Sequence, residues 1–171
     1  MSDTHPQLWS IQARAFRILY TPFTHNFWVL SAPDSRIISQ IHGLAFNPAT
    51  GTTTAIGNSS CLLLAIEDAT ISWSLQPNQP TAVCTTGSEG EIFQRWQAAV
   101  RALPAINELN LHYPNLWQHF CKKNSNSVFH TIGRILNFPH PERILKTCAP
   151  GIHFLLSEEL IEKYRYQQEF Q

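Results

Sequence analysis

Alternation of hydrophobic and polar residues dominates the first third of the chain and predicts β-strands. Side chains alternate along Ile11–Tyr20, with long groups on both sides, as in a strand. Pro22 ends that pattern, and the aromatic and β-branched run His25–Leu30 indicates a second strand. Residues 32–35, Ala-Pro-Asp-Ser, are typical of a type I turn, and residues 36–46 return as a third strand. We therefore expect a β-hairpin.

The hairpin brings two histidines together. If its turn is centred on Pro33 and Asp34, His25 lies opposite His42, and both imidazoles point to the same face of the sheet. A bulge would shift this register by one residue.

The next segments are less regular. Residues 47–60 form a Gly/Thr/Asn loop, and residues 61–66 indicate either a buried strand or a short helix. Residues 70–75 alternate as a strand, and residues 76–80 indicate a turn.

Helical periodicity appears in the second half. Ser88 and Glu91 have the spacing of a capping box, and the residues that follow keep one face apolar until Pro104: Ile92, Trp96, Ala99, Val100 and Leu103. Ser157 can cap a polar C-terminal helix that ends near Gln168.

A further helix begins near Ser125. Asn124 or Asn126 can cap it, and its apolar positions recur with helical period at Val128, Ile132, Ile135 and Leu136. A serine there faces unpaired backbone N–H groups and the positive end of the helix dipole, which suits a nucleophile or a bound anion. A simple cap is the commoner role.

Taken together, the elements predict an α+β fold in which a small antiparallel sheet packs against the Ser125 helix and flanking helices. The length suggests a single domain over residues 1–171, with a loose N-terminus at 1–9. No apolar stretch is long enough to span a membrane and no secretion signal is recognisable, so we expect a soluble, cytoplasmic protein, with leaderless export left open.

Composition excludes several classes of function. Twelve basic and twelve acidic residues give zero formal charge, and no basic run exceeds Lys122-Lys123, so we expect no nucleic-acid partner. The four cysteines show no C-x-x-C spacing, and His112 and His119 lack an accompanying carboxylate at a metal-binding spacing. No phosphate-binding loop is present, and we predict neither a metal nor a cofactor.

What remains is a candidate nucleophilic site made of Ser125, His25 and His42. Nucleophilic catalysis needs a hydroxyl or thiol, a base within hydrogen-bond reach, and a third group that orients the base. Each residue alone is ordinary, because a single histidine on a strand more often has a structural role.

Three short motifs resemble a known group. Gln12-Ala13-Arg14, His25-Asn26-Phe27-Trp28-Val29 and Asn124-Ser125-Asn126-Ser127-Val128 are similar to motifs of the circularly permuted papain-like NlpC/P60 group, in which an H-x-x-[WI] strand precedes an N-[CS]-N-[ST]-[FV] helix start. The chain resembles most closely an uncharacterised bacterial subgroup whose helix start reads Gly-Pro-Asn-Ser-Asn-[Ser/Thr]-Phe. The resemblance covers about residues 10–140. It implies that Ser125 is the nucleophile, His25 the base and His42 the orienting residue.

Two departures from that group bear on function. Active members usually carry Cys where this chain has Ser125, and Lys122-Lys123 replace the Gly-Pro of the subgroup. A serine hydroxyl must lose its proton to the base during attack, so Ser125 depends on the alignment of His25. The resemblance implies a hydrolase or acyltransferase acting on an amide or ester bond of a peptide, cell-wall or acyl substrate. The alternative is a catalytically silent module that binds a protein partner through the same cleft.

Overall fold

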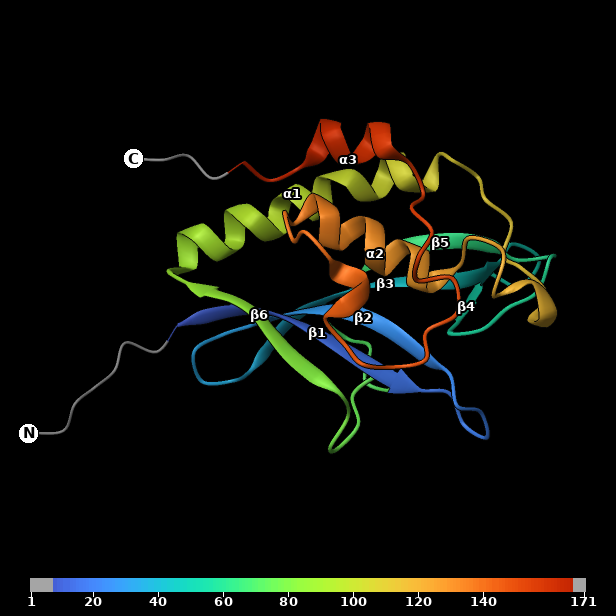
Figure 1. The fold of residues 1–171 in the computed structure, drawn as a ribbon, viewed down its shortest axis with the longest axis horizontal. Helices are drawn as coiled ribbons and strands as arrows, with labels where there is room; N and C mark the ends of the chain where they lie inside the picture. The colour runs from blue at the N-terminus through green and yellow to red at the C-terminus, as the bar shows by residue number, and fades with distance from the viewer. Residues whose placement is uncertain (1–7, 168–171) are drawn as a thin grey trace, which may run out of the picture.

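An antiparallel sheet of six strands and three α-helices form the described part of this computed structural model; two helices cover one face of the sheet, and the third packs on those two (Figure 1). That part is residues 8–167, apart from the side chain of Leu116. The arrangement confirms the predicted α+β class. None of its helices is both long enough and apolar enough to cross a membrane.

The strands and helices follow one another with short connections. The strands are β1 (Trp9–Arg17), β2 (Thr24–Ser31), β3 (Ile37–Asn47), β4 (Thr52–Thr54), β5 (Leu62–Glu67) and β6 (Thr81–Gly87). The helices are α1 (Glu89–Asn107), α2 (Ser125–Ile135) and α3 (Glu158–Tyr164), with short 3₁₀ turns η1 (Leu116–Gln118) and η2 (Pro141–Arg143).

The sheet has the order β4-β3-β2-β1-β6, and β5 pairs with β3. The predicted hairpin of β2 and β3 is confirmed, with Pro33 and Asp34 in its turn. These two strands pair only from the turn to Trp28 and Ile41. From Ile41 onward β3 pairs with β5, whereas β2 stays beside β1 over its whole length. The sheet is therefore split between β2 and β3 at the end away from their turn.

The predicted register of the hairpin is wrong by two residues. Trp28 faces Ile41 and Leu30 faces Ser39, so His25 and His42 are diagonal neighbours and not directly opposite. The register shifts between Leu30 and Ser31. Ser35 in the turn has a left-handed φ of 66°, so the turn includes more residues than Pro33 and Asp34 alone. A shift of two residues keeps both imidazoles on one face.

The sheet differs from the prediction in other places too. Residues 70–75 are irregular, because they fold over the sheet face opposite the helices, where Trp73 packs against Phe16 with ring centroids 5.3 Å apart. The edge strand β6 was not expected, since its residues are mostly small and polar. The short strand β4 lies within the predicted loop 47–60, and β5, Leu62–Glu67, confirms the strand alternative for residues 61–66 except at Cys61.

The helices begin as predicted and end differently. Ser88 and Glu91 form the expected capping box of α1, but the helix continues through Pro104 to Asn107, because Leu103 and Ile106 on either side of the proline are buried in the core. The C-terminal helix ends at Tyr164, short of the expected end near Gln168, which lies outside the described residues. So do residues 1–7 of the expected loose N-terminus, whereas Trp9 already belongs to β1.

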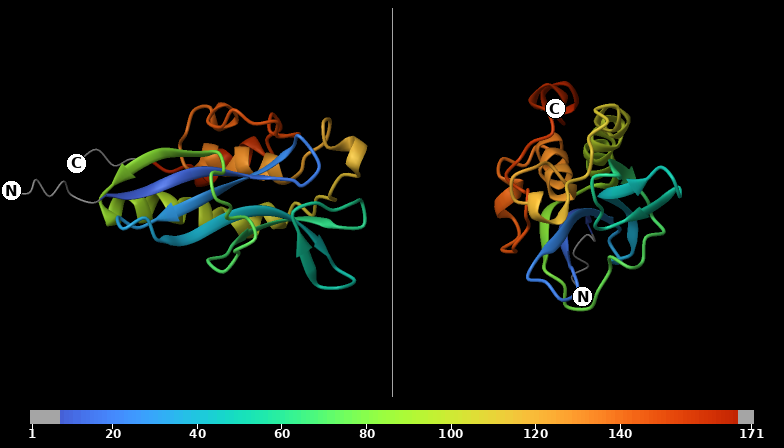
Figure 2. Two further views of the ribbon diagram at one scale, coloured as in Figure 1. Left: turned by 90° about the horizontal axis from the view of Figure 1, so that it is seen from below. Right: turned by 90° about the vertical axis from the view of Figure 1, so that its right-hand side faces the viewer.

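The core lies between the sheet and helices α1 and α2. Ile11, Trp28 and Ile41 enter it from three neighbouring strands and are almost fully buried. Trp28 ties β2 to α2, because its ring stacks on Phe129 at 4.5 Å and its Nε1 donates to the Phe129 carbonyl at 2.9 Å. This contact fixes α2 over the centre of the sheet, as the three views agree (Figures 1 and 2).

Gly43 sets the closeness of α2 to β3. A Cβ at this position would lie 2.7 Å from Val128 Cβ and 2.9 Å from the Cα of Ser125, both closer than real contacts allow. We predict that Gly43→Ala lowers the free energy of unfolding by about 2–3 kcal/mol, because the helix start must move away from the strand.

Gly90→Ala is the matched control for that prediction. A Cβ on Gly90 meets nothing within 4 Å, and the position lies in the first turn of α1. This variant should be as stable as the parent, or more stable by up to about 1 kcal/mol. Urea denaturation of both variants checks the pair, and a Gly43→Ala protein of parental stability would contradict the described packing.

Candidate functional site

The first turn of α2 occupies the split between β2 and β3. The Asn126 side chain accepts from the backbone N–H of Asn26 at 2.9 Å and donates to the carbonyl of Thr24 at 3.0 Å. The Asn126 amide thus satisfies two backbone groups of β2 that would otherwise form hydrogen bonds with β3. These residues flank His25 on β2, and Gly43, which touches Ser125, follows His42 on β3. The helix start therefore lies beside both histidine-bearing positions.

Asn124 caps this helix, as one of the two predicted alternatives. Its side chain accepts from the backbone N–H of Asn126 at 2.9 Å, and its own N–H donates to Ser127 Oγ at 3.0 Å. Asn124 Nδ2 also donates to the Pro150 carbonyl at 3.0 Å, and Ser127 Oγ donates to Gly151 O at 2.8 Å. The cap is thereby fixed to the segment around residue 150 as well as to the helix.

His25 and His42 do come together, in a chain of buried polar groups. His25 Nε2 lies 3.0 Å from His42 Nδ1, and the two rings are coplanar within 2°. His42 Nε2 lies 3.2 Å from Gln40 Oε1, and Gln40 Nε2 donates to the Ile71 carbonyl at 2.6 Å. Phe27 stacks on His42 at 4.5 Å, and Trp73 covers both imidazoles.

The Ile71 carbonyl, at the end of this series of hydrogen bonds, determines which atom donates in each of them. The Ile71 carbonyl can only accept, so the Gln40 amide nitrogen faces it and Gln40 Oε1 must accept from His42 Nε2–H. The Nδ1 of a neutral His42 is then bare and accepts from His25 Nε2–H. His25 Nδ1 is left with a free lone pair, and this buried atom has no hydrogen-bond partner among residues 8–167.

Burial keeps both imidazoles neutral. Desolvation lowers the pKa of His25 to about 4. Desolvation, with a smaller contribution from the neighbouring His25, lowers the pKa of His42 to about 2. His25 therefore presents an unprotonated Nδ1 at neutral pH, although a pKa this far below 7 makes it a weaker base than a free imidazole.

Ser125 has a different partner. Its hydroxyl lies 3.3 Å from Tyr113 Oη, which lies 3.0 Å from the Ala55 carbonyl oxygen. The phenol has one proton and the carbonyl can only accept, so we assign the tyrosine proton to Ala55 and the serine proton to Tyr113. The backbone N–H of Ser125 also faces the tyrosine oxygen. Burial raises the pKa of Tyr113 to about 12, so the phenol stays protonated.

The predicted grouping is therefore assembled only in part. The histidines are paired, and the helix start contacts the strands next to them. Strand alternation, however, sends the histidine side chains to the sheet face opposite Trp28 and Gly43, which both contact α2. No hydrogen bond joins Ser125 to either imidazole within the described residues.

Three residues of the site were not predicted from the sequence. Gln40 lies two positions before His42 on the same strand, so alternation could have placed it beside the imidazole. Asn126 was considered only as a cap. Tyr113 lies in an irregular segment twelve residues before Ser125, and no local pattern relates the two.

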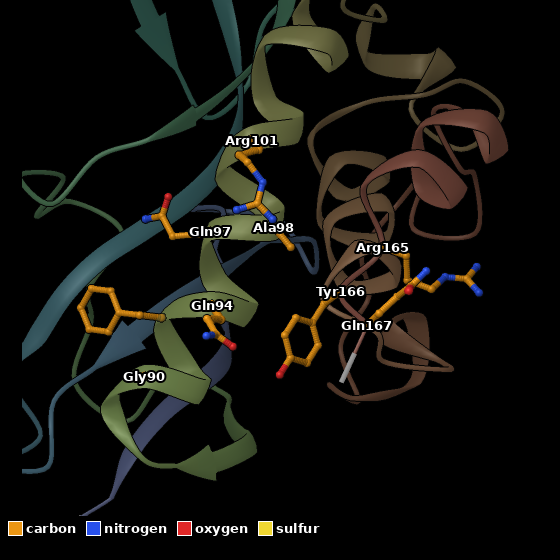
Figure 3. Close-up of a pocket in the computed structure, with 9 residues that line it drawn as sticks. Gly90, Gln94, Gln97, Ala98, Arg101, Arg165, Tyr166 and Gln167 are labelled. Atoms are coloured by element: carbon orange, nitrogen blue, oxygen red, sulfur yellow. The ribbon is translucent and has the colours of Figure 1, made fainter. Parts of the chain in front are cut away.

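A small apolar cavity opens beside Ser125. Its volume is about 40 Å³, enough for one or two water molecules. Its lining includes Phe23, Ile56, Tyr113 and Phe120. A roomier groove of about 580 Å³ lies elsewhere, between α1 and residues 165–167, and contains none of the predicted site residues (Figure 3). Over residues 8–167, no group of three or more His, Cys, Asp or Glu side chains is placed to hold a metal ion.

Comparison with known proteins adds no relative. No protein-family model, no curated protein and no solved structure matched the chain. The NlpC/P60 resemblance thus stays a prediction based on the sequence motifs.

The lowered pKa values of His25 and His42 predict acid sensitivity. In the unfolded chain both groups take up protons near pH 6.5, whereas in the folded protein they do so only near or below pH 4. The stability that they contribute is present above about pH 6.5 and is lost as the pH falls. We predict that the free energy of unfolding drops by about 3 kcal/mol or more between pH 7 and pH 4.

Chemical denaturation across that pH range measures this loss. His42→Phe should make the dependence on pH clearly shallower, because one buried imidazole is removed. The exposed His112 is the control, and His112→Gln should leave the curve unchanged. An identical pH dependence in His42→Phe and the parent would contradict the assignment.

Proposed function

We propose that the protein is a hydrolase or acyltransferase that acts on an amide or ester bond, with Ser125 as nucleophile, His25 as general base and His42 as the orienting residue. The observation that carries the proposal is the free lone pair on His25 Nδ1. Buried nitrogens without a partner are rare in folded proteins, and a chain of three polar groups fixes this one in the unprotonated state.

The start of α2 supplies the other parts. Ser125 is the first residue of the helix, where backbone N–H groups are unpaired and the helix dipole is positive. Asn126, the next residue, is hydrogen-bonded to the strand residues on both sides of His25. These contacts hold the helix start against the backbone of β2 beside His25, whereas the Ser125 hydroxyl points to Tyr113 and the imidazole lies on the other face of the sheet.

Tyr113 occupies the place of a substrate oxygen in this proposal. Its Oη lies 3.3 Å from the Ser125 hydroxyl, and the hydroxyl and backbone N–H at a helix start are the groups that would meet the carbonyl oxygen of a substrate. The structure is then a resting state. A substrate that displaces Tyr113 frees the hydroxyl, and the proposal requires the start of α2 to move relative to β2 so that the hydroxyl reaches His25.

The reaction follows from these roles. Ser125 Oγ attacks the carbonyl carbon while its proton passes to His25 Nδ1, and His42 Nδ1 continues to accept from His25 Nε2–H. The imidazolium then gives the proton to the leaving nitrogen or oxygen, and an acyl-serine remains. Water or another hydroxyl attacks that ester with the same base, which regenerates Ser125 and releases or transfers the acyl group.

Covalent labelling with a fluorophosphonate tests the proposal. We expect a single adduct on Ser125, located by mass spectrometry. His25→Ala should lower the labelling rate by a factor of about a hundred or more, because the base is lost. Tyr113→Phe should raise the rate, because the competing oxygen is removed.

Ser88 provides a matched control. It is also a serine at a helix start, where it caps α1 through Glu91, and it has no imidazole beside it. Ser88→Ala should label like the parent. Should Ser125 stay unlabelled in the parent and in Tyr113→Phe at high probe concentration, the enzymatic proposal is wrong.

That blank result would favour the second candidate, a catalytically silent binding module. Two observations speak for it: the bond between Ser125 and Tyr113, and the small volume of the cavity. In that case Ser125→Cys decides whether the base is placed at all. A thiol beside a working His25 should react with iodoacetamide faster than a free model thiol near pH 7, and a silent site should not accelerate it.

A further inference from the structure

Large hydrophobic side chains are exposed together at one end of the molecule, around the Ser125 cavity. Leu19 is 69 % exposed, Tyr20 is fully exposed, Trp117 is 88 % exposed and Phe120 is 58 % exposed. Ile56 stands at the cavity itself and is 37 % exposed. We call these five residues the apolar rim.

Separate segments of chain build this rim. They are the turn between β1 and β2, the loop after β4, and the region of η1, which all lie at the end away from both termini (Figures 1 and 2). Phe23 and Phe120 meet edge to face at 5.2 Å, so the first and third segments are in contact. Residues from all three segments line the Ser125 cavity.

The β1–β2 turn exposes hydrophobic side chains on a backbone that includes an unfavourable conformation. Tyr20 has a φ of 63°, a left-handed conformation that is unfavourable for a residue with a side chain. Both Leu19 and Tyr20 at this turn project into solvent and bury little surface. Hydrogen bonds from Thr21 N–H to the Ile18 carbonyl and from Ile18 N–H to the Phe23 carbonyl close this turn, but packing in the core does not account for the two exposed side chains.

The charged side chains at this end of the molecule are all basic. The four stretches that form it, residues 17–24, 47–58, 112–126 and 144–150, contain no Asp or Glu. They contain Arg17, Lys122, Lys123 and Lys146, although the whole chain has zero formal charge. The last stretch joins this end through a bridge between Cys148 and Phe23.

We infer that this end docks on an anionic lipid bilayer. Trp, Tyr, Phe and Leu at projecting tips are the side chains that enter the interfacial region of a membrane, and nearby lysines and arginines are attracted to acidic headgroups. Tips on separate turns suit a soft surface, whereas a protein partner requires a broad complementary face. The inference goes beyond the proposed function and does not depend on Ser125 being a nucleophile.

Vesicle flotation tests the inference directly. The probes are phosphatidylcholine vesicles with and without about 30 % phosphatidylglycerol. We expect the full chain to bind the anionic vesicles about tenfold or more tightly than the neutral ones. Leu19→Ser combined with Trp117→Ser should weaken binding to the anionic vesicles at least about tenfold.

Matched variants separate the apolar rim from hydrophobic exposure in general. Leu8 and Val83 are 46 % and 59 % exposed and lie outside the rim. Leu8→Ser combined with Val83→Ser should bind like the parent. Lys122→Gln combined with Lys146→Gln should reduce the preference for anionic vesicles, whereas Lys163→Gln in α3 should not.

Ser125→Ala distinguishes this inference from the catalytic proposal, because it should abolish labelling and leave vesicle binding unchanged. The inference is overturned if the parent fails to bind anionic vesicles at millimolar lipid, or if the rim and control variants lose binding equally. Self-association that disappears in the rim variant, without vesicle binding by the parent, would also overturn it and assign the surface to a second copy of the chain.

Discussion

The arrangement of this protein depends on how the gap between β2 and β3 is filled. Strands that separate leave backbone donors and acceptors without partners, and buried groups of this kind are costly. Asn126 meets that need, because its amide replaces β3 opposite Thr24 and Asn26. One side chain at the second position of α2 therefore does what a strand would do, and it brings the helix start into the sheet.

Several features of the site follow from that insertion. Gly43 must lack a side chain, because Ser125 and Val128 lie against it. The cap residue Asn124 becomes buried, and its amide is satisfied by the segment at Pro150. The backbones of His25 and His42 pair with β1 and β5 and not with each other, and their imidazoles meet across the split. The hydrogen-bond chain from Ile71 through Gln40 and His42 then leaves the lone pair on His25 Nδ1 free.

The sequence predicted those elements of the fold that depend on short-range residue patterns. Pro33 and Asp34 indicated the hairpin, the Ser88 capping box indicated α1, and Asn124 indicated the start of α2. Register could not be read, because the shift between Leu30 and Ser31 has no signature in the residue types. Whether the histidines and Ser125 lie on the same side of the sheet depends on which face α2 covers. Tertiary contacts decide this, so the sequence pattern could not predict it. Tyr113 could not be predicted as a site residue for the same reason, because it contacts Ser125 only in the folded chain.

The central claim is that His25, on the strand next to the start of α2, holds a bare Nδ1, and nuclear magnetic resonance can test it most directly. Long-range ¹H–¹⁵N correlation spectra of the imidazoles near pH 7 report which ring nitrogen carries the proton. The structure predicts that His25 and His42 are both neutral and that both carry the proton on Nε2, with the His25 Nδ1 resonance typical of an unprotonated nitrogen. A proton on His25 Nδ1, or a charged imidazole at either position, would contradict the account.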